Sequence, residues 1–167
     1  MKKLRLILSF DCNRKCVGCC NNDWDKSKIP VCRDFSGYDQ VLLTGGEPLL
    51  KPLLTAITIK EIRKVSTADI FIYTAKTDDP LKLLGLLAIS DGVTITLYEQ
   101  KDLPNFDYFN SFLDGKLTDK SLRLNVFKGI NFDAKLFPRW KIKSDIEWVK
   151  DCPLPDGEVL MKLSFLY

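Results

Sequence analysis

The chain contains no histidine. That absence excludes a Ser-His-Asp triad, a catalytic zinc held by histidines and an imidazole acting as general base. Apolar runs long enough to cross a membrane are also missing. The apolar stretch after Met1-Lys2-Lys3 is too short for a signal peptide and runs directly into Asp11. We therefore expect a cytoplasmic protein with no membrane partner.

Neither sign of charge dominates, because 25 Lys and Arg residues stand against 22 Asp and Glu residues and leave a net charge of +3. This mild excess does not favour a nucleic-acid partner. Basic residues gather weakly between Lys135 and Lys143, where a solvated face is a simpler interpretation than a phosphate-binding patch. The length of 167 residues and the hydrophobic fraction of 46% fit one domain, 1–167, with its own core.

Cysteines are few and unevenly spread, since four of the six fall between Cys12 and Cys20. This distribution does not suggest a disulfide scaffold, and in a reducing compartment closely spaced cysteines indicate metal or redox chemistry. Cys20, Cys32 and Cys152 make no second cluster motif. We interpret these three as buried or incidental thiols.

Apolar, β-prone runs alternate with helical patterns along the chain. The expected strands are 4–10, 40–44, 70–74, 93–97, 122–127, 139–143 and 158–165. The expected helices are 52–65 and 81–89, with an ambiguous segment at 103–113 and a helix-like turn at 144–150. The first helix is predicted to bury one face, made of Leu54, Ile57, Ile62 and Val65.

Alternation of strand and helix favours an α/β fold with a parallel sheet and right-handed crossovers. A closed barrel of eight βα units needs about 250 residues. A chain of 167 residues therefore predicts a partial (β/α) barrel of about five or six mostly parallel strands, with short helices outside.

The first candidate site is a cysteine loop with the spacing Cys12-x3-Cys16-x2-Cys19, directly after the first predicted strand. The carboxyl ends of parallel strands are where ligands bind in α/β sheets. Three thiolates on one loop can hold three irons of a [4Fe–4S] cluster and leave the fourth iron free. On this loop alone, a structural zinc site completed by Cys20 or Cys32 fits equally well.

The second candidate site is the run Thr44-Gly45-Gly46-Glu47-Pro48, which ends the second predicted strand. The glycines let the backbone approach a ligand closely. Backbone carbonyls and the Glu47 carboxylate could then hold an ammonium group. Taken alone, however, this run is more simply an ordinary strand-to-helix turn.

Occurring together and in this order, the two motifs resemble those of the radical S-adenosylmethionine (SAM) superfamily. The resemblance covers roughly residues 1–75, while residues 76–167 agree with the family only in their alternation of strands and helices. It implies that Cys12, Cys16 and Cys19 ligate a [4Fe–4S] cluster whose fourth iron binds the methionine part of SAM.

The same resemblance implies that Gly45, Gly46 and Glu47 hold the amino group of SAM. Thr74, at the end of the third predicted strand, stands where the family often has a polar residue near the ribose or carboxylate. Lys76 is a weaker candidate for that role. The stretch 125–130 falls where the family packs apolar residues and backbone against adenine.

The reaction that the resemblance implies is reductive cleavage of SAM to a 5′-deoxyadenosyl radical, which abstracts hydrogen from a substrate. An external one-electron reductant, flavodoxin- or ferredoxin-like, would supply the electron. The radical requires a dry, apolar interior. The sequence identifies no further catalytic residue, and Trp24, Tyr73 and Tyr98 are interpreted as core or pocket wall.

Two substrate classes stay open. Gly18, Asn21 and Trp24 resemble the activating enzymes of glycyl-radical proteins. The segment 44–50 and the opening Cys12-Asn13 look more like members that modify small molecules or peptides, such as 7-carboxy-7-deazaguanine synthase. Two hypotheses belong to another class. One is a non-catalytic iron–sulfur protein whose cluster has a fourth cysteine ligand, and the other is a binding protein stabilised by a structural zinc ion.

Overall fold

Seven short segments of the chain pair side by side as parallel strands in a computed structural model that describes residues 1–164. The strands are β1 (Lys3–Ser9), β2 (Gln40–Gly45), β3 (Asp69–Thr74), β4 (Gly92–Leu97), β5 (Ser121–Phe127), β6 (Lys141–Ile146) and β7 (Glu158–Lys162). They form one sheet in the order β6-β5-β4-β3-β2-β1-β7. Every neighbouring pair is parallel, which confirms the predicted α/β class with a parallel sheet.

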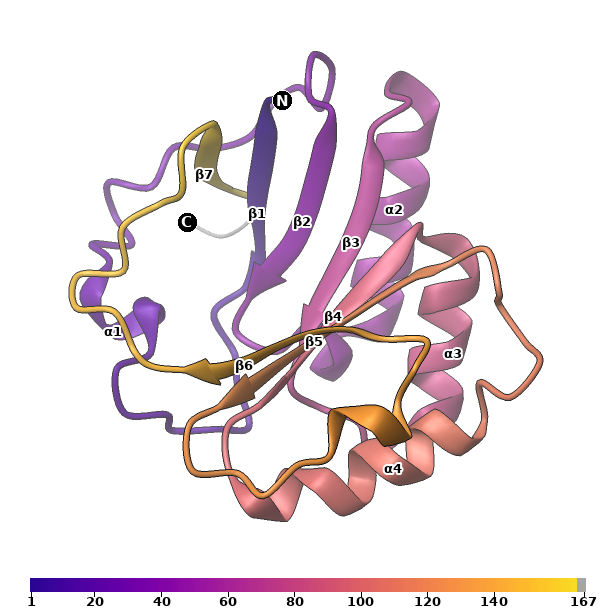
Figure 1. Ribbon diagram of the computed structural model, residues 1–167. Helices are drawn as coiled ribbons and strands as arrows, with labels where there is room; N and C mark the ends of the chain where they lie inside the picture. The colour runs from indigo at the N-terminus through magenta and orange to yellow at the C-terminus, as the bar shows by residue number, and fades with distance from the viewer. Residues whose placement is uncertain (165–167) are drawn as a thin grey trace.

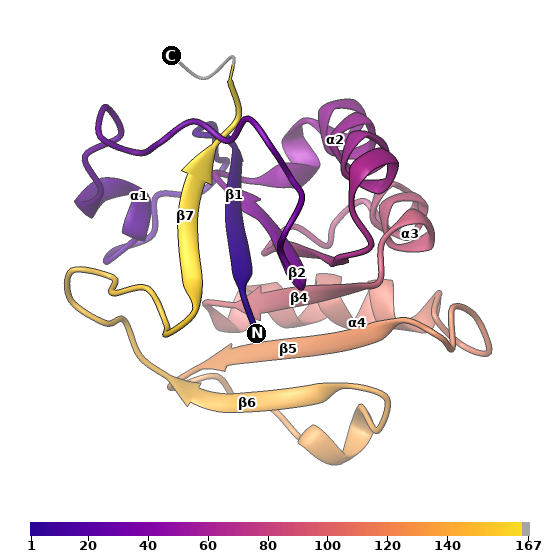
Figure 2. The same cartoon turned by 90° about the horizontal axis from the view of Figure 1, so that it is seen from above.

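Four helices connect or flank the strands within this part of the chain. They are α1 (Cys20–Asp23), α2 (Pro52–Val65), α3 (Pro80–Ile89) and α4 (Leu103–Ser111). Figures 1 and 2 show α2, α3 and α4 together on one side of the sheet and the short α1 on the other. The three longer helices are the crossovers that carry the chain from β2 through to β5.

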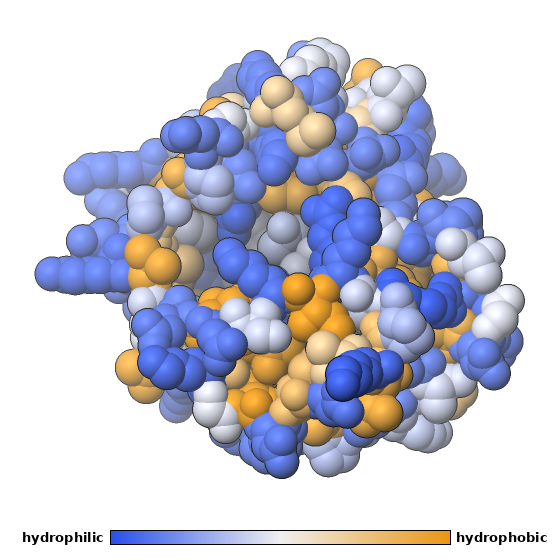
Figure 3. Space-filling model, viewed as in Figure 1, coloured by the Kyte–Doolittle hydropathy of each residue, from blue (hydrophilic) through white to orange (hydrophobic). Residues whose placement is uncertain are grey.

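The sheet curls strongly, so that β7 and β1 run across the direction of β5 and β6 in Figure 2. Its two edges, β6 and β7, do not pair with each other within residues 1–164, and the sheet is therefore not closed. The connection 147–157 crosses the side of the molecule between these edges (Figures 1 and 2). In the view of Figure 1 the surface is hollowed near its centre, with hydrophilic side chains around much of the rim (Figure 3).

Side-chain alternation in β5 shows how the sheet divides the molecule. Leu122, Leu124 and Val126 are buried in the main core, whereas the residues between them are half-buried on the opposite face. The same core receives Ile59 of α2 and Phe106 of α4. Apolar burial therefore fixes the helices to one face and leaves the other face available for a site.

The predicted elements agree with the structure through β5, and the ambiguous segment at 103–113 contains α4. The strand count is seven within residues 1–164, not five or six. The helix-like turn predicted at 144–150 is wrong, because β6 extends to Ile146 by pairing with β5. Tertiary pairing overrides the local pattern there. The predicted closing strand is β7, and its expected last residue, Phe165, lies outside the described residues.

The predicted buried face of α2 is partly wrong. Ile57 and Val65 are exposed, and the helix buries Thr55 and Thr58 together with Ile59 and Ile62. Both threonine hydroxyls donate to backbone carbonyls, Thr58 to the carbonyl one turn earlier in the same helix at 2.9 Å. Because these hydroxyls are satisfied locally, they can enter the interface with the sheet, and the buried face is rotated from the one that hydrophobicity alone predicts.

No helix within residues 1–164 combines the length and the apolar character that a membrane crossing requires.

The corrected face of α2 can be tested with two substitutions. Ile62 is fully buried and Val65 is 56% exposed, although both belong to the face predicted from sequence. We expect Ile62→Ala to lower the free energy of unfolding by about 2–5 kcal/mol. The matched control Val65→Ala should change it by less than about 0.5 kcal/mol. Urea unfolding followed by circular dichroism measures both, and equal losses would contradict the observed orientation.

Candidate functional site

The carboxyl ends of four adjacent strands meet at one cavity of about 160 Å³. The loop after β1 carries the three predicted cysteine ligands, and β2 ends in the predicted glycine turn. Thr74 ends β3, and Tyr98 directly follows β4. Cavity-lining residues among the sequence predictions are Cys12, Cys16, Cys19, Gly45, Gly46, Glu47 and Thr74. The structure thus brings the two motifs and Thr74 together.

The glycine turn lies directly against the backbone that leads out of β1. Gly46 donates its N–H to the carbonyl of Ser9 at 2.6 Å, and Glu47 donates its N–H to the carbonyl of Asp11 at 2.7 Å. A Cβ on Gly46 would overlap the Asp11 carbonyl, and Gly45 has a φ of +120°. Both glycines are therefore required for β2 to end in contact with the start of the cysteine loop.

The Glu47 carboxylate is 3% exposed and joins the ends of β2 and β3. Its Oε1 accepts hydrogen bonds from the Leu49 N–H and the Thr74 hydroxyl, and its Oε2 accepts one from the Ala75 N–H at 3.0 Å. Burial raises the pKa of Glu47, although these donors and Arg14 oppose the rise. Oε2 retains the capacity to accept a second hydrogen bond from a ligand.

Thr74 is not a free polar group at the cavity. Its hydroxyl donates to Glu47 at 2.6 Å and accepts the N–H of Lys76 at 2.9 Å. Lys76, the weaker candidate, directs its ammonium group to the carboxylate of Asp78. Thr74 therefore positions Glu47 in this structure, and Lys76 is engaged with an exposed acid.

The three predicted ligand cysteines line the cavity with different exposure. Cys12 is exposed, while Cys16 and Cys19 are half-buried. Partial burial raises the pKa of the Cys12 and Cys16 thiols, and the nearby Arg14 charge acts in the opposite direction on both. Within the described residues, no three Cys, Asp or Glu side chains are already arranged to hold a metal ion. The thiols share a cavity and suit soft metals such as iron or zinc.

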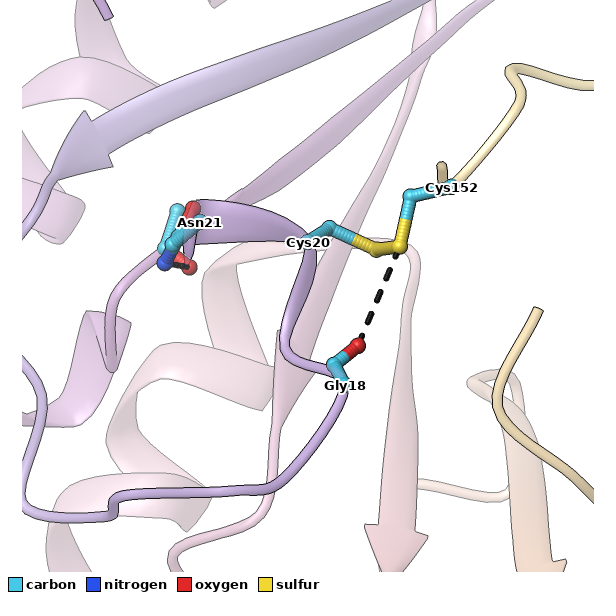
Figure 4. The surroundings of a disulfide bond; sticks show 5 residues. Gly18, Cys20, Asn21 and Cys152 are labelled. Carbon is cyan, nitrogen blue, oxygen red and sulfur yellow. Dashed lines mark hydrogen bonds between the residues drawn. A yellow bond between two sulfur atoms is a disulfide. The ribbon is translucent and has the colours of Figure 1, made fainter. Parts of the chain in front are cut away.

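Cys20 and Cys152 form a disulfide, with 5.5 Å between their Cα atoms (Figure 4). The expectation that both are incidental thiols is wrong. The two residues are separated by 132 positions, and only the path of the connection after β6 brings them together. Cys32 is a free, buried cysteine that donates to the carbonyl of Asp34 and does not line the cavity.

Arg14, which the sequence analysis missed, joins the cysteine loop to two strand ends. Its guanidinium donates to both oxygens of Asp102, at 3.0 and 2.5 Å, and to the carbonyl of Ala75. Asp102 also accepts the backbone N–H groups of Tyr98 and Glu99. Burial opposes the charge of Asp102, but the Arg14 and backbone hydrogen bonds keep its pKa below the ordinary value. No short-range pattern announces this pair, whose members lie 88 positions apart.

Aromatic rings form one wall of the cavity. The ring of Trp148 stacks on Tyr98 with 5.2 Å between centroids and 5° between planes, and Phe127 packs against both. Trp24, Tyr73 and Tyr98 all line the cavity, as the pocket-wall interpretation expected. Trp148 was missed because its segment was predicted to be helical, whereas it is an irregular connection.

Two further side-chain hydrogen bonds involve residues at the cavity. Asn21 of α1 donates its amide to the carbonyl of Gly45 at 2.6 Å, which joins the residues after the cysteine loop to the turn. In the stretch predicted to pack against adenine, Asn125 donates to the Thr96 hydroxyl at 3.5 Å. Asn21, Gly45 and Thr96 line the cavity, whereas none of the residues 125–130 does.

Comparisons of the chain with models of protein families, with curated protein sequences and with solved structures found no match.

The glycine turn gives a direct test of the site's geometry. Gly46→Ala should lower the free energy of unfolding by about 1–3 kcal/mol, because the new Cβ meets a backbone carbonyl that has no room to move. Gly85, an exposed position in α3 with no atom near its missing side chain, supplies the control. Gly85→Ala should raise stability by about 0.5–1 kcal/mol. Chemical unfolding of both variants checks the opposite signs.

The ion pair between Arg14 and Asp102 predicts a dependence on pH. Asp102→Asn should reduce stability at pH 7 by about 1.5–3 kcal/mol, because charge-assisted hydrogen bonds are lost. The folded-state pKa of Asp102 lies below its ordinary value of 3.8. The contribution of the ionised carboxylate to stability is therefore complete above pH 3.8, and it is lost as the pH falls through the lower, folded-state pKa. The difference between wild type and variant should therefore shrink in acid.

Asp119, an exposed acid paired with the half-buried Lys120, is the control for this measurement. Asp119→Asn should change stability by less than about 0.5 kcal/mol at pH 7. Urea unfolding of the three proteins at pH 7 and at several acidic values supplies the comparison. If the stability difference between wild type and Asp102→Asn stayed constant across that pH range, the ionised Asp102 carboxylate would be excluded as the source of the stabilisation.

Proposed function

We propose that this chain is a radical SAM enzyme built on a partial (β/α) barrel. When bound, a reduced [4Fe–4S] cluster and SAM would supply a 5′-deoxyadenosyl radical able to abstract hydrogen from a substrate. The open sheet with helices on one side and a cavity at its strand ends is compatible with such a barrel.

The observation that carries the proposal is the shared cavity of the two motifs. Cys12, Cys16 and Cys19 line the same space as the turn at 45–47, although the motifs come from separate loops. Backbone hydrogen bonds join the turn to Ser9 and Asp11, where the cysteine loop begins. A ligand held by the thiols would therefore be adjacent to the groups suited to an ammonium.

The number of free thiols at the cavity supports a cluster with one iron that lacks a protein ligand, rather than a metal site with four protein ligands. Cys20 lines the cavity but is joined to Cys152, and Cys32 is buried elsewhere. A structural zinc site or an electron-carrying cluster normally has four protein ligands. Three thiols fit a cluster that leaves one iron free for SAM.

The chain's own residues would divide the work as follows. Cys12, Cys16 and Cys19 supply thiolates, and the Arg14 guanidinium places positive charge beside this anionic loop. Glu47, braced by Thr74, offers its Oε2 to an ammonium group. A dry environment would come from the stacked aromatic wall, which excludes water from reactive species.

Between the two substrate classes, we propose a small molecule or peptide rather than a folded glycyl-radical protein, on the basis of the disulfide-bonded state of the site. The connection 147–157 crosses the open side of the sheet, and the cavity of about 160 Å³ has aromatic side chains at its wall. A folded partner would need a wide approach to the strand ends. An external one-electron donor, flavodoxin- or ferredoxin-like, in the cytoplasm completes the proposal.

Anaerobic reconstitution with iron and sulfide tests this function. We expect about four irons per chain and formation of 5′-deoxyadenosine from SAM once a low-potential reductant is added. Cys12→Ala should lose the cluster because a ligand is removed. Cys32→Ala is the matched control and should keep it, since Cys32 lies away from the cavity. Absorbance, iron analysis and product chromatography measure these results.

The other classes give different outcomes in the same experiment. A cluster that disappears in Cys20→Ala under reducing conditions and never binds SAM would indicate a four-cysteine electron carrier. Zinc retained in place of iron after anaerobic purification would indicate a zinc-stapled module. Either result would overturn the enzyme proposal.

A further inference from the structure

The connection between β6 and β7, residues 147–157, is anchored to the cysteine loop at a covalent point. Cys152 of this connection, here called the strap, is bonded to Cys20, which directly follows the predicted ligand Cys19 (Figure 4). The Cys152 sulfur also lies 3.9 Å from the carbonyl oxygen of Gly18. The strap is therefore fixed to the same loop that carries the thiols of the candidate site.

A second anchor is the side chain of Trp148. It stacks on Tyr98, and it packs so closely on Gly18 that a Cβ there would lie 2.8 Å from the Trp148 ring. Gly18 also has a φ of +76°, a conformation that glycine adopts without cost. Both anchors of the strap thus meet the cysteine loop, and Trp148 and Cys20 line the cavity.

Beyond these anchors, few contacts hold the strap: Lys3 donates its N–H to the Gly157 carbonyl at 2.8 Å, at the start of β7, and Cys152 donates its N–H to the Val149 carbonyl within the strap. Val149, Lys150 and Asp151 are exposed, and the ion pair between Glu147 and Lys128 is exposed on both sides. The backbone of Asp151 and Cys152 has φ values of +61° and +39°, which side chains other than glycine rarely adopt. A segment with few apolar contacts and an unfavourable backbone keeps its position through its anchors.

The strap limits the size of the site. The cavity of about 160 Å³ is smaller than the roughly 300–1,000 Å³ typical of pockets for small molecules. Trp148 stands at its wall, so movement of the strap would enlarge it. The disulfide-bonded structure therefore combines a small cavity with Trp148 in its wall.

We propose that the Cys20–Cys152 disulfide is a redox-controlled latch, whose reduction frees the strap and opens the cavity. The identity of what then enters, a cluster and SAM, rests on the proposed function. The latch itself rests on the disulfide, the Trp148 contacts and the cavity volume.

The chemical step is a two-electron thiol–disulfide exchange with a dithiol reductant. One thiolate of the reductant attacks the half-buried Cys20 sulfur, the S–S bond breaks, and the nearly buried Cys152 leaves as a thiolate that takes a proton. The second thiol of the reductant then releases Cys20 as a thiol. The reductant is oxidised to its own disulfide, and two electrons and two protons reach the protein.

The test uses the full chain with Cys12, Cys16 and Cys19 changed to Ala, so that no other cavity thiol can exchange with the disulfide. Trypsin cleavage after Lys150, within the strap, reports opening and is followed by mass spectrometry. We expect cleavage to accelerate about tenfold or more when dithiothreitol is added, because the open population rises. The wild-type chain is measured in parallel to show that the background variant behaves normally.

Two further substitutions in that background separate the latch from general loosening. Cys152→Ser should be cleaved rapidly with or without dithiothreitol. Cys32→Ser, the matched control, should keep the full redox dependence, because Cys32 is a free thiol apart from the strap. Equal cleavage rates in the oxidised and reduced background would overturn the latch.

Alkylation of Cys20 and Cys152 in air-oxidised protein without reductant would overturn it equally, since it would mean that no disulfide forms. These measurements need neither iron nor SAM. A failed reconstitution beside a working latch would therefore reject the proposed function alone. A successful reconstitution beside a redox-insensitive strap would reject the latch alone.

Discussion

The buried Glu47 carboxylate is the interaction on which the candidate site depends. A charge removed from water needs hydrogen-bond donors, and Glu47 receives them from Leu49, Thr74 and Ala75. Its own N–H reaches back to Asp11 at the exit of β1. One side chain and its backbone therefore hold the ends of β1, β2 and β3 in a fixed relation. These bonds bring the two sequence motifs to one cavity.

Arg14 and Asp102 extend this arrangement by one strand. The pair joins the cysteine loop to Ala75 after β3 and, through Asp102, to the backbone after β4. Both side chains are largely buried, and the guanidinium donates to both oxygens of the carboxylate, which makes the link directional as well as electrostatic. The cysteine loop has almost no regular structure of its own, so such side-chain links, rather than a helix or strand, determine where its thiols lie.

The sequence predicted most of what depends on neighbouring residues. Apolar alternation and helical spacing located all seven strands, at least in part, and the helices α2 and α3, because those patterns follow from which face of an element is buried. The sequence placed the cysteine loop and the Gly45–Glu47 turn each after a strand, and the shared cavity agrees with the rule that ligands bind at the carboxyl ends of parallel strands. What could not be predicted joins distant positions: Arg14 with Asp102, Trp148 with Tyr98, and Cys20 with Cys152. Local composition carries no signal for such pairs.

The disulfide also explains how an unclosed sheet can enclose a site. In a full barrel the last strand pairs with the first, and backbone hydrogen bonds complete the wall. Here β6 and β7 do not pair with each other within residues 1–164, and the strap crosses between them (Figure 2). Its attachment to Cys20 replaces part of the missing wall with one covalent bond. Hydrogen-bonded strands open only by unfolding, whereas a disulfide is broken by thiol–disulfide exchange. The proposed latch would therefore give this unclosed sheet a closure that the redox state of its surroundings can reverse.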